Sequence, residues 1–314
     1  MGTGVMGTAV IGAGSLGRWL AAKMQASGNV VTLVTRPGSA AGPLSCQVKS
    51  LDGNLQRTLE SAPATALPAG GFQRLFYCTK AKDLRDAAQE TSHLLSPDGV
   101  AVLLSNGLGH VESLATAGMS RCLVASVTYG LCPDENGVVE ERGTGGLVRV
   151  GPLSSECATP ASVADAKLLS GLFQDAGLQS LATEDGDELI WKKAMLNAGL
   201  NPVCALLRQE NGALPGTASF ALSIEAAREV IQVAKEVGVD LSDIDPERLL
   251  VDLCQDTATN RCSTLQDLDR GQPTEMEWIC GAVVRIAERF GIETPANRLL
   301  AKLVQDVEVA SVAI

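Results

Sequence analysis

Three glycines near the start of the chain have the spacing that a backbone needs in order to hold a phosphate. They belong to the run Gly12-Ala13-Gly14-Ser15-Leu16-Gly17, which fits the pattern G-x-G-x-x-G. We expect Gly12 to allow a tight turn, Gly14 to let the backbone approach a pyrophosphate, and Gly17 to let a helix pack closely. The apolar residues Thr8 to Ile11 predict a strand before the run. Ser15 to about Ser27 predicts a helix whose amino end attracts anions.

A glycine hexad alone is a weak signal, because a plain structural turn can use the same residues. Gly2 to Gly7 also fit the pattern, but no strand can precede them, so we interpret them as a chance match. The second copy has a strand before it, a helix after it and Arg36 after the next predicted strand, Val30–Val34. An NAD-specific site carries Asp or Glu there, whereas a cation suits the 2′-phosphate of NADP. The pattern therefore predicts an NADP(H) site.

A second set of chemically capable side chains lies near position 200. Lys193, Asn197 and Asn201 are spaced i, i+4 and i+8, so they would follow one face of a helix. Apolar residues surround them, and an amine with two amides is costly to bury unless these groups contact a ligand or one another. The alternative is a solvated stripe on a helix that ends at Asn201 and Pro202. The spacing supports both interpretations.

Further polar residues lie where predicted elements end. Lys80 follows the apolar strand Arg74–Cys78, and Asn106 follows Val100–Leu104. Ligands bind at the carboxyl ends of strands in open α/β sheets, although a lysine there is often a plain surface charge. Asn260 and Ser263 precede a short predicted helix, where Ser263 by itself would be an ordinary capping residue.

The elements that must position these side chains divide the chain into two predicted parts. Up to about residue 184, strands alternate with helices, which indicates a mostly parallel sheet. From residue 185 onward amphipathic helices dominate and we find no clear strand. We therefore predict an α/β protein: a Rossmann-like dinucleotide-binding domain over 1–184 and an all-helical substrate and catalytic domain over 185–314. The helices predicted there are Glu188–Gly199, Ser219–Val237, Asp245–Thr259, Glu275–Phe290 and Ala296–Val309.

Composition narrows the class of protein. The 314 residues are 46% hydrophobic and carry a net charge of −11, which argues against nucleic acid and anionic membranes as partners. Nine scattered cysteines and two histidines fit reduced thiols in a cytoplasmic protein better than a disulfide framework or a metal site. No run reaches the roughly 18 apolar residues of a membrane span. The expected partner is a small molecule.

Taken together, these motifs resemble the ketopantoate reductase (2-dehydropantoate 2-reductase) family. The resemblance rests on the glycine turn, Lys80, Asn106-Gly-Leu-Gly, the Lys193-Asn197-Asn201-Pro202 helix, Asn211-Gly212, the segment Asn260 to Asp267, and Thr274-Glu275. The motifs keep their order over nearly the whole chain.

The resemblance implies NADPH-dependent reduction of ketopantoate to pantoate, in the biosynthesis of pantothenate and coenzyme A. Lys193 would be the proton donor, since an ammonium can stabilise the charge that develops on the ketone oxygen and then protonate it. The implied substrate contacts are Asn106, Asn197, Asn201, Asn211, Asn260 and Ser263. The implied cofactor contacts are Gly12, Ala13, Gly14, Ser15, Leu16, Gly17, Arg36, Lys80, Asn106, Leu131 and Glu275.

Two other functions stay open on the sequence. One is a related NADP-dependent enzyme: either a reductase of another 2-keto acid, or a hydroxyacid dehydrogenase of the same two-domain plan, for which the Asn260–Ser263 segment and the context of Arg36 fit less well. The other is a non-catalytic NADP-binding sensor, against which Lys193 and Glu275 speak. The protein would be a monomer or a homodimer.

Overall fold

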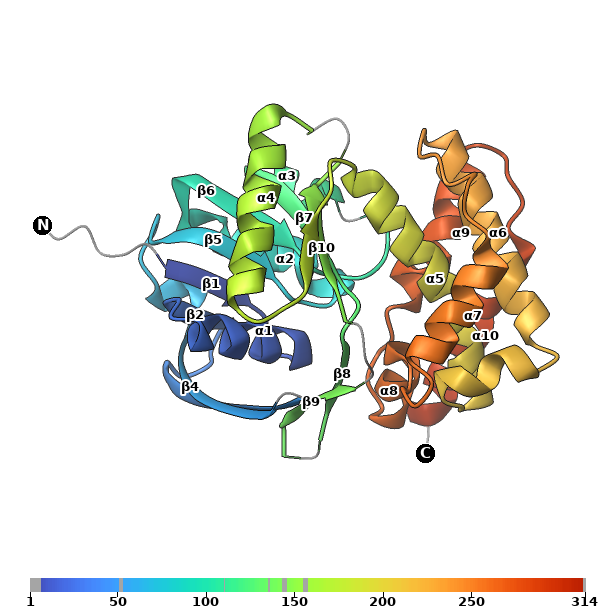
Figure 1. The fold of residues 1–314 in the computed structure, drawn as a ribbon, viewed down its shortest axis with the longest axis horizontal. Coiled ribbons are helices and arrows are strands. Elements are labelled where there is room, and N and C mark those ends of the chain that lie inside the picture. Colours follow the sequence, from blue (N-terminus) through green and yellow to red (C-terminus); the bar gives the residue numbers. More distant parts are fainter. Residues whose placement is uncertain are drawn as a thin grey trace, which may run out of the picture. The chain divides into compact units, whose positions relative to one another are not determined.

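The computed structural model describes residues 7–50, 53–109, 111–134, 136–142, 146–154 and 158–312. They form two compact units, which are coloured along the chain in Figure 1. The first unit holds the described residues up to 105 together with 111–142 and 146–186. The second holds 106–109 and 187–312. Of the glycine hexad that we interpret as a chance match, residues 2–6 lie outside the described residues.

One eleven-stranded sheet forms the first unit, with the strand order β11-β10-β7-β6-β5-β1-β2-β4-β3-β9-β8. Most neighbouring strands are parallel, as predicted, and the antiparallel pairs are β3 with β4, β7 with β10, and β8 with β9. The strands are β1 Gly7–Ile11, β2 Val31–Thr35, β3 Gly42–Ser50, β4 Gly53–Pro63, β5 Phe72–Tyr77, β6 Leu95–Leu103, β7 Cys122–Val127, β8 Gly130–Pro133, β9 Val139–Arg142, β10 Val148–Pro152 and β11 Ser180–Ala182.

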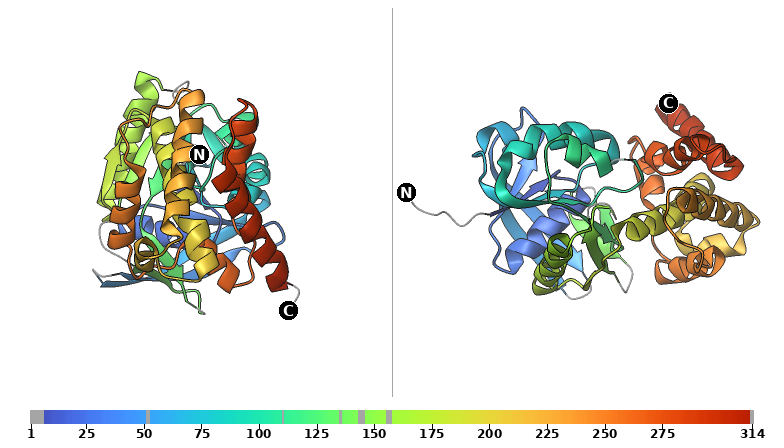
Figure 2. Two further views of the ribbon diagram at one scale, coloured as in Figure 1. Left: turned by 90° about the vertical axis from the view of Figure 1, so that its right-hand side faces the viewer. Right: turned by 90° about the horizontal axis from the view of Figure 1, so that it is seen from above.

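Helices cover both faces of this sheet (Figure 2, right). They are α1 Ser15–Ala26, α2 Ala81–Thr91, α3 Val111–Thr116 and α4 Pro160–Asp175. Successive residues of a strand point to opposite faces. Accordingly Phe76 packs 5.8 Å from the ring of Phe173 in α4, while the hydroxyl of Tyr77 lies 2.8 Å from that of Thr91 in α2. Strands β1 and β7 are buried along nearly their whole length, so both of their faces are covered, which explains why they are continuous apolar runs in the sequence.

The second unit is helical, and its described residues contain no strand. Its elements are α5 Gly186–Leu207, whose first residue belongs to the first unit, η4 Asn211–Gly216, α6 Phe220–Glu236, α7 Pro246–Asp256, α8 Ser263–Asp269, η5 Met276–Trp278, α9 Cys280–Glu288 and α10 Pro295–Val312. Apolar faces of these helices form a separate core, which includes Met195, Val230 and Val283. The structure therefore confirms the predicted fold class: an α/β part with a mostly parallel sheet and an all-helical part.

Three local predictions were wrong. The helix with Lys193, predicted over Glu188–Gly199, continues through Pro202 to Leu207, so the stop at Asn201 and Pro202 in the alternative interpretation is absent too. A proline inside a helix removes one hydrogen bond, but Val203, Cys204 and Ala205 bury their side chains in the core, which offsets that loss. The predicted helix 275–290 breaks at Ile279 into η5 and α9. Helix α8 is capped by the thiol of Cys262 instead of Ser263. The sequence analysis also missed α3 and β8.

Candidate functional site

The glycine turn has the geometry that close approach of a ligand requires. Gly12 has φ +102°, and a Cβ on Gly17 would lie 1.9 Å from the carbonyl oxygen of Gly12, so neither position tolerates a side chain. Gly14 precedes α1, and a Cβ placed there would meet no atom within 4 Å. No side chain caps the amino end of α1, and its first turn holds no acidic residue. Open space beside uncapped N–H groups fits a phosphate.

Three other predicted cofactor residues belong to the same unit. Arg36 follows β2 directly and is exposed, and Lys80 occupies the N-cap position of α2, just beyond β5. Leu131 lies on β8, opposite Glu141 of β9, and is half-buried. A cation after β2, a cation after β5 and the uncapped end of α1 are a set of groups that suits a phosphorylated dinucleotide.

In the second unit, three residues that are far apart in the sequence form what we call the Glu275 cluster: Asn106, Lys193 and Glu275. The amide nitrogen of Asn106 donates to Oε2 of Glu275 at 3.0 Å. Glu275 in turn is the charged group that acts on the ammonium of Lys193, which projects from α5. One carboxylate therefore accepts a hydrogen bond from an amide of the segment 106–109 and acts electrostatically on an amine of α5.

Backbone packing fixes Asn106 in this cluster. The N–H of Leu108 donates to the carbonyl oxygen of Trp278 at 2.8 Å. Gly107 has φ +95°, and a Cβ at this position would lie 2.3 Å from the same oxygen. Only glycine allows this approach. The Asn-Gly-Leu-Gly motif thus attaches Asn106 to η5, the turn that follows Glu275.

The electrostatic state of Lys193 results from two opposing effects. Desolvation disfavours the ammonium, whereas the Glu275 carboxylate favours it, and the net result lowers the pKa of Lys193 from 10.5 to about 8. Desolvation therefore dominates. The residue is half-buried, so part of its surface stays accessible. An ammonium that loses its proton close to neutral pH is suited to general acid chemistry.

Asn197 and Asn201 lie on α5 together with Lys193, as predicted. Asn201 is buried, and its amide nitrogen lies 3.5 Å from the hydroxyl of Ser263, at the start of α8. Asn197, one turn before, is half-buried, and Ser263 is exposed. The thiol of Cys262 donates to the carbonyl oxygen of Asn201 at 3.3 Å. The structure therefore brings the Asn260–Asp267 segment against the helix of Lys193.

Asn211 and Asn260 are more deeply buried than a freely accessible substrate contact would be. The amide nitrogen of Asn211 donates to the hydroxyl of Thr257 at 2.9 Å, and its backbone N–H donates to the carbonyl oxygen of Asn260 at 2.9 Å. Among the described residues, neither side-chain oxygen has a hydrogen-bond partner, and both are covered. These two residues join η4 to the turn before α8. Their predicted contact with substrate stays a prediction.

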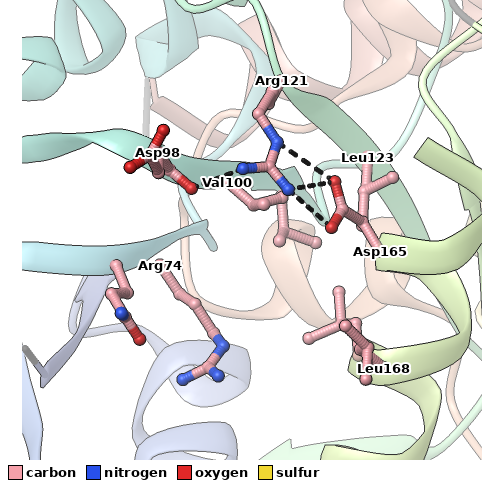
Figure 3. A pocket seen from close by; sticks show the side chains of 10 residues that line it. Arg74, Asp98, Val100, Arg121, Leu123, Asp165 and Leu168 are labelled. Atoms are coloured by element: carbon pink, nitrogen blue, oxygen red, sulfur yellow. Dashed lines mark hydrogen bonds and ion pairs between the residues drawn. The ribbon is translucent and has the colours of Figure 1, made fainter. Parts of the chain in front are cut away.

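A cavity of about 180 Å³ lies in the first unit (Figure 3). Arg121 forms a two-pronged ion pair with Asp165 at 2.6 and 2.7 Å and donates to the carbonyl oxygen of Asp98 at 2.6 Å. None of the ten lining residues is a predicted site residue. The ion pair joins the residue before β7 to α4, so we interpret the polar groups of this cavity as structural.

Sequence reasoning missed one side chain at the glycine turn. Arg18 donates through Nε to the carbonyl oxygen of Ala13 at 2.8 Å, which ties the turn to α1. A polar residue directly after the last glycine is the signal that was overlooked.

The described part of the chain shows no metal site, no disulfide bond and no helix suited to span a membrane. Its eight cysteines are free, and it holds no group of His, Cys, Asp or Glu side chains that could bind a metal. None of its helices combines the length and the apolar character that crossing a membrane requires.

A mostly parallel sheet with a glycine-rich turn at a helix amino end is typical of dinucleotide-binding proteins, and a helical unit that carries a desolvated lysine fits the class of nicotinamide-dependent oxidoreductases. Comparison with known proteins identifies the particular family. Residues 8–155 match the family described as "Ketopantoate reductase PanE/ApbA", and residues 185–308 match "Ketopantoate reductase PanE/ApbA C terminal".

Individual proteins agree with this assignment. The chain is 31% identical to the 2-dehydropantoate 2-reductase of Archaeoglobus fulgidus over 95% of this chain and 97% of that protein. It is also 31% identical to the corresponding protein of Halobacterium salinarum, over 96% and 98%. A ternary structure of D-mandelate dehydrogenase with NADH and anilino(oxo)acetate has the same fold, with a TM-score of 0.87, 22% identity and coverage of 98% and 99%. The chain belongs to the ketopantoate reductase family and is an NADP-dependent oxidoreductase of the 2-dehydropantoate 2-reductase type.

Proposed function

We propose that this protein reduces 2-dehydropantoate to pantoate with NADPH, in the cytoplasm, as a step of pantothenate and coenzyme A biosynthesis. The domain 1–184 would bind the cofactor, and 185–314 would supply the substrate and catalytic groups. The observation that carries the proposal is the lysine of the Glu275 cluster, whose pKa is lowered to about 8. The family membership and the two curated relatives named 2-dehydropantoate 2-reductase support the choice of substrate.

The residues of the first unit fit the cofactor. The uncapped amino end of α1 and the open space at Gly14 would receive the pyrophosphate, and the exposed guanidinium of Arg36 would pair with the 2′-phosphate. Lys80 and Leu131 would line the remainder of the cofactor site. When bound, NADPH supplies the hydride that adds to the ketone carbon.

Lys193 would perform the acid step. As the carbonyl π-bond breaks, its electron pair moves to the oxygen, where the ammonium stabilises the negative charge. The lysine then transfers one proton to that oxygen, which gives the hydroxyl group of pantoate, and the neutral amine regains a proton from solvent. Glu275 would favour the charged form of the amine, and Asn106, Asn197 and Ser263 would orient the substrate. Asn201, also a predicted substrate contact, would in addition hold Ser263 through the contact between their side chains.

The test compares two adjacent lysines. Lys193→Ala should lower kcat for ketopantoate reduction by about 10² to 10⁴, because general acid catalysis contributes this much. NADPH affinity should change little, since the proposed phosphate contacts lie in the other unit. Lys192 is the matched control: it lies next on the same helix, about 100° around its axis, and Lys192→Ala should retain nearly full activity.

Loss of NADPH absorbance gives kcat, and fluorescence titration gives the NADPH Kd. Equal losses in the two variants, or a Lys193→Ala enzyme that keeps most of its kcat, would contradict the role of Lys193. Parallel assays with other 2-keto acids test the substrate: a higher kcat/KM for one of them would replace ketopantoate in the proposal.

A further inference from the structure

The turn that carries Glu275 is held by a carboxylate from the last helix of the chain. The backbone N–H of Thr274 donates a hydrogen bond to Oε1 of Glu308, which lies on α10. Thr274 is only 6% exposed, and its hydroxyl accepts the N–H of Met276 at 3.3 Å. On the other side of the turn, the carbonyl oxygen of Glu275 accepts the N–H of Trp278 at 2.9 Å. Glu308 thus fixes the backbone one residue before the cluster carboxylate.

The position of Glu308 is unfavourable unless this contact compensates for it. The residue lies near the carboxyl end of α10, where the helix dipole disfavours a negative charge. Among the described residues no Lys or Arg forms an ion pair with it. The hydrogen bond to a buried N–H is the interaction that the structure gives its carboxylate. Glu308 is therefore an acid in a position that the helix dipole disfavours, and its carboxylate is bound to the buried N–H of Thr274. We explain its presence there by a role in holding the backbone at Thr274.

Loss of this hydrogen bond would affect the Glu275 cluster, because Thr274 is the residue directly before Glu275. Without an acceptor, the buried N–H of Thr274 would be left without a partner, so the turn would have to move to find one. Glu275 contacts Asn106 at 3.0 Å, so a small shift of the turn lengthens that bond and weakens the effect on Lys193. We propose that Glu308 is a positioning residue for Glu275, and so for the charge of Lys193. This inference rests on the proposed role of the Glu275 cluster.

The experiment uses three variants of the full chain. Glu308→Ala removes the acceptor, and Glu308→Gln keeps a side-chain oxygen that can accept the same bond. Asp306→Ala is the matched control, because it removes an exposed acid from the same helix. For each variant we would measure the rate at which a small amine-reactive acylating reagent labels Lys193 as a function of pH, by peptide mass spectrometry. Labelling requires the neutral amine, so its midpoint reports the pKa of Lys193 without any assay of turnover.

Glu308→Ala should move the labelling midpoint below the wild-type value of about 8, since Glu275 would stabilise the ammonium less. It should also lower kcat on the order of 10-fold, the effect expected for losing a hydrogen bond that orders the site. Glu308→Gln and Asp306→Ala should match the wild type in both measurements.

An unchanged midpoint in Glu308→Ala would overturn the inference, even if the variant unfolds at a lower temperature, because that result would show a structural role only. A Glu308→Gln variant as impaired as Glu308→Ala, or a shift of equal size in Asp306→Ala, would overturn it too. The labelling readout separates this inference from the proposed function. A wild-type protein that fails to reduce ketopantoate would refute the function, while the midpoints would still test Glu308.

Discussion

At the scale of single residues, the balance around Lys193 sets the chemistry that the second unit can do. Burial alone would lower the pKa of its ammonium further, and Glu275 partly reverses this effect. With a pKa of about 8, about nine in ten molecules carry the proton at pH 7. In the proposed mechanism the side chain would therefore be charged when the ketone binds, and its lowered pKa would let it release the proton readily. A surface lysine with the ordinary value of 10.5 would be a much weaker acid.

This balance predicts the pH dependence of the reaction. If Lys193 is the proton donor, the proposed ketopantoate reduction requires its ammonium, so kcat/KM should fall about tenfold per pH unit above a pKa of about 8, while pantoate oxidation should rise through the same pKa. Glu275→Gln removes the group that raises this pKa, so the fall should begin at a lower pH. Initial rates from pH 6 to 10 would measure both profiles. A profile of Glu275→Gln that lies at the wild-type position or above it would show that Glu275 does not act on Lys193.

The same pKa also affects stability, with a definite sign. Because the folded value of about 8 lies below the ordinary 10.5, the unfolded chain binds the proton of Lys193 more tightly over that interval. This one group therefore makes the folded state more stable as pH rises from 8 to 10.5, and its unfavourable contribution is complete below 8.

Cofactor preference is a second residue-scale prediction. Arg36 should form a charge-assisted pair with the 2′-phosphate worth about 1.5 to 3 kcal/mol, which corresponds to about 10- to 150-fold in kcat/KM for NADPH over NADH. Arg36→Ala should remove most of this preference by raising KM for NADPH. Steady-state kinetics with both cofactors would measure the ratio. An unchanged ratio in the variant would exclude Arg36 from the cofactor site.

At the scale of elements, a side chain of one helix accepts hydrogen bonds from the N–H groups at the amino end of another helix. Helix α10 begins with Pro295, and its first N–H groups have no partners within the helix. Glu229 of α6 accepts the N–H groups of Ala296 and Asn297 at 2.8 and 2.9 Å, and the amide of Asn297 at 2.8 Å. A carboxylate at a helix amino end also interacts favourably with the helix dipole. Glu229 therefore fixes α10, the helix that carries Glu308, at its opposite end.

We expect Glu229→Ala to lower the free energy of unfolding by about 1 to 3 kcal/mol, because it leaves buried N–H groups without an acceptor. The control is Glu225→Ala, one turn earlier on α6, which removes an exposed ion pair with Arg228. Such pairs contribute less than about 1 kcal/mol. Urea unfolding followed by circular dichroism would give both values. Equal effects would show that Glu229 is no more than a surface charge.

At the scale of the whole molecule, the chain builds two separate cores and distributes its candidate residues between them. The first core includes Trp19, Phe76 and Phe173, and the second includes Met195, Val230 and Val283. The glycine turn, Arg36, Lys80 and Leu131 depend on the first core for their position, and the Glu275 cluster depends on the second. The predicted cofactor contacts and the Glu275 cluster can therefore be tested separately in the intact protein, by a measurement that gives a value for each segment of the chain.

Hydrogen exchange of the full chain provides that observable. Addition of NADPH should slow exchange at the backbone amides of residues 14–17, because phosphate oxygens would accept hydrogen bonds from N–H groups at the uncapped end of α1. Exchange in α6 and α7, which hold none of the predicted cofactor residues, should stay the same. Mass spectrometry of peptides before and after NADPH would show the pattern. Protection of α6 and α7 without protection of 14–17 would contradict the placement of the cofactor in the first unit.

The sequence by itself determined the features that depend on neighbours along the chain. The strand, glycine turn and helix from Thr8 onward follow from local apolar runs and glycine spacing, and the i, i+4, i+8 spacing put Lys193, Asn197 and Asn201 on one helix. The roles assigned to these residues, and the division at 184 and 185, stay predictions.

Only the tertiary structure decided which distant groups meet. Asn106 and Glu275 are 169 residues apart, and the bond between them depends on a glycine that lies against the carbonyl oxygen of Trp278. The passage of α5 through Pro202 and the support of Thr274 by Glu308 likewise depend on packing between elements. So does the lowered pKa of Lys193, because desolvation and the field of a carboxylate depend on what surrounds a group in space, which no local spacing encodes.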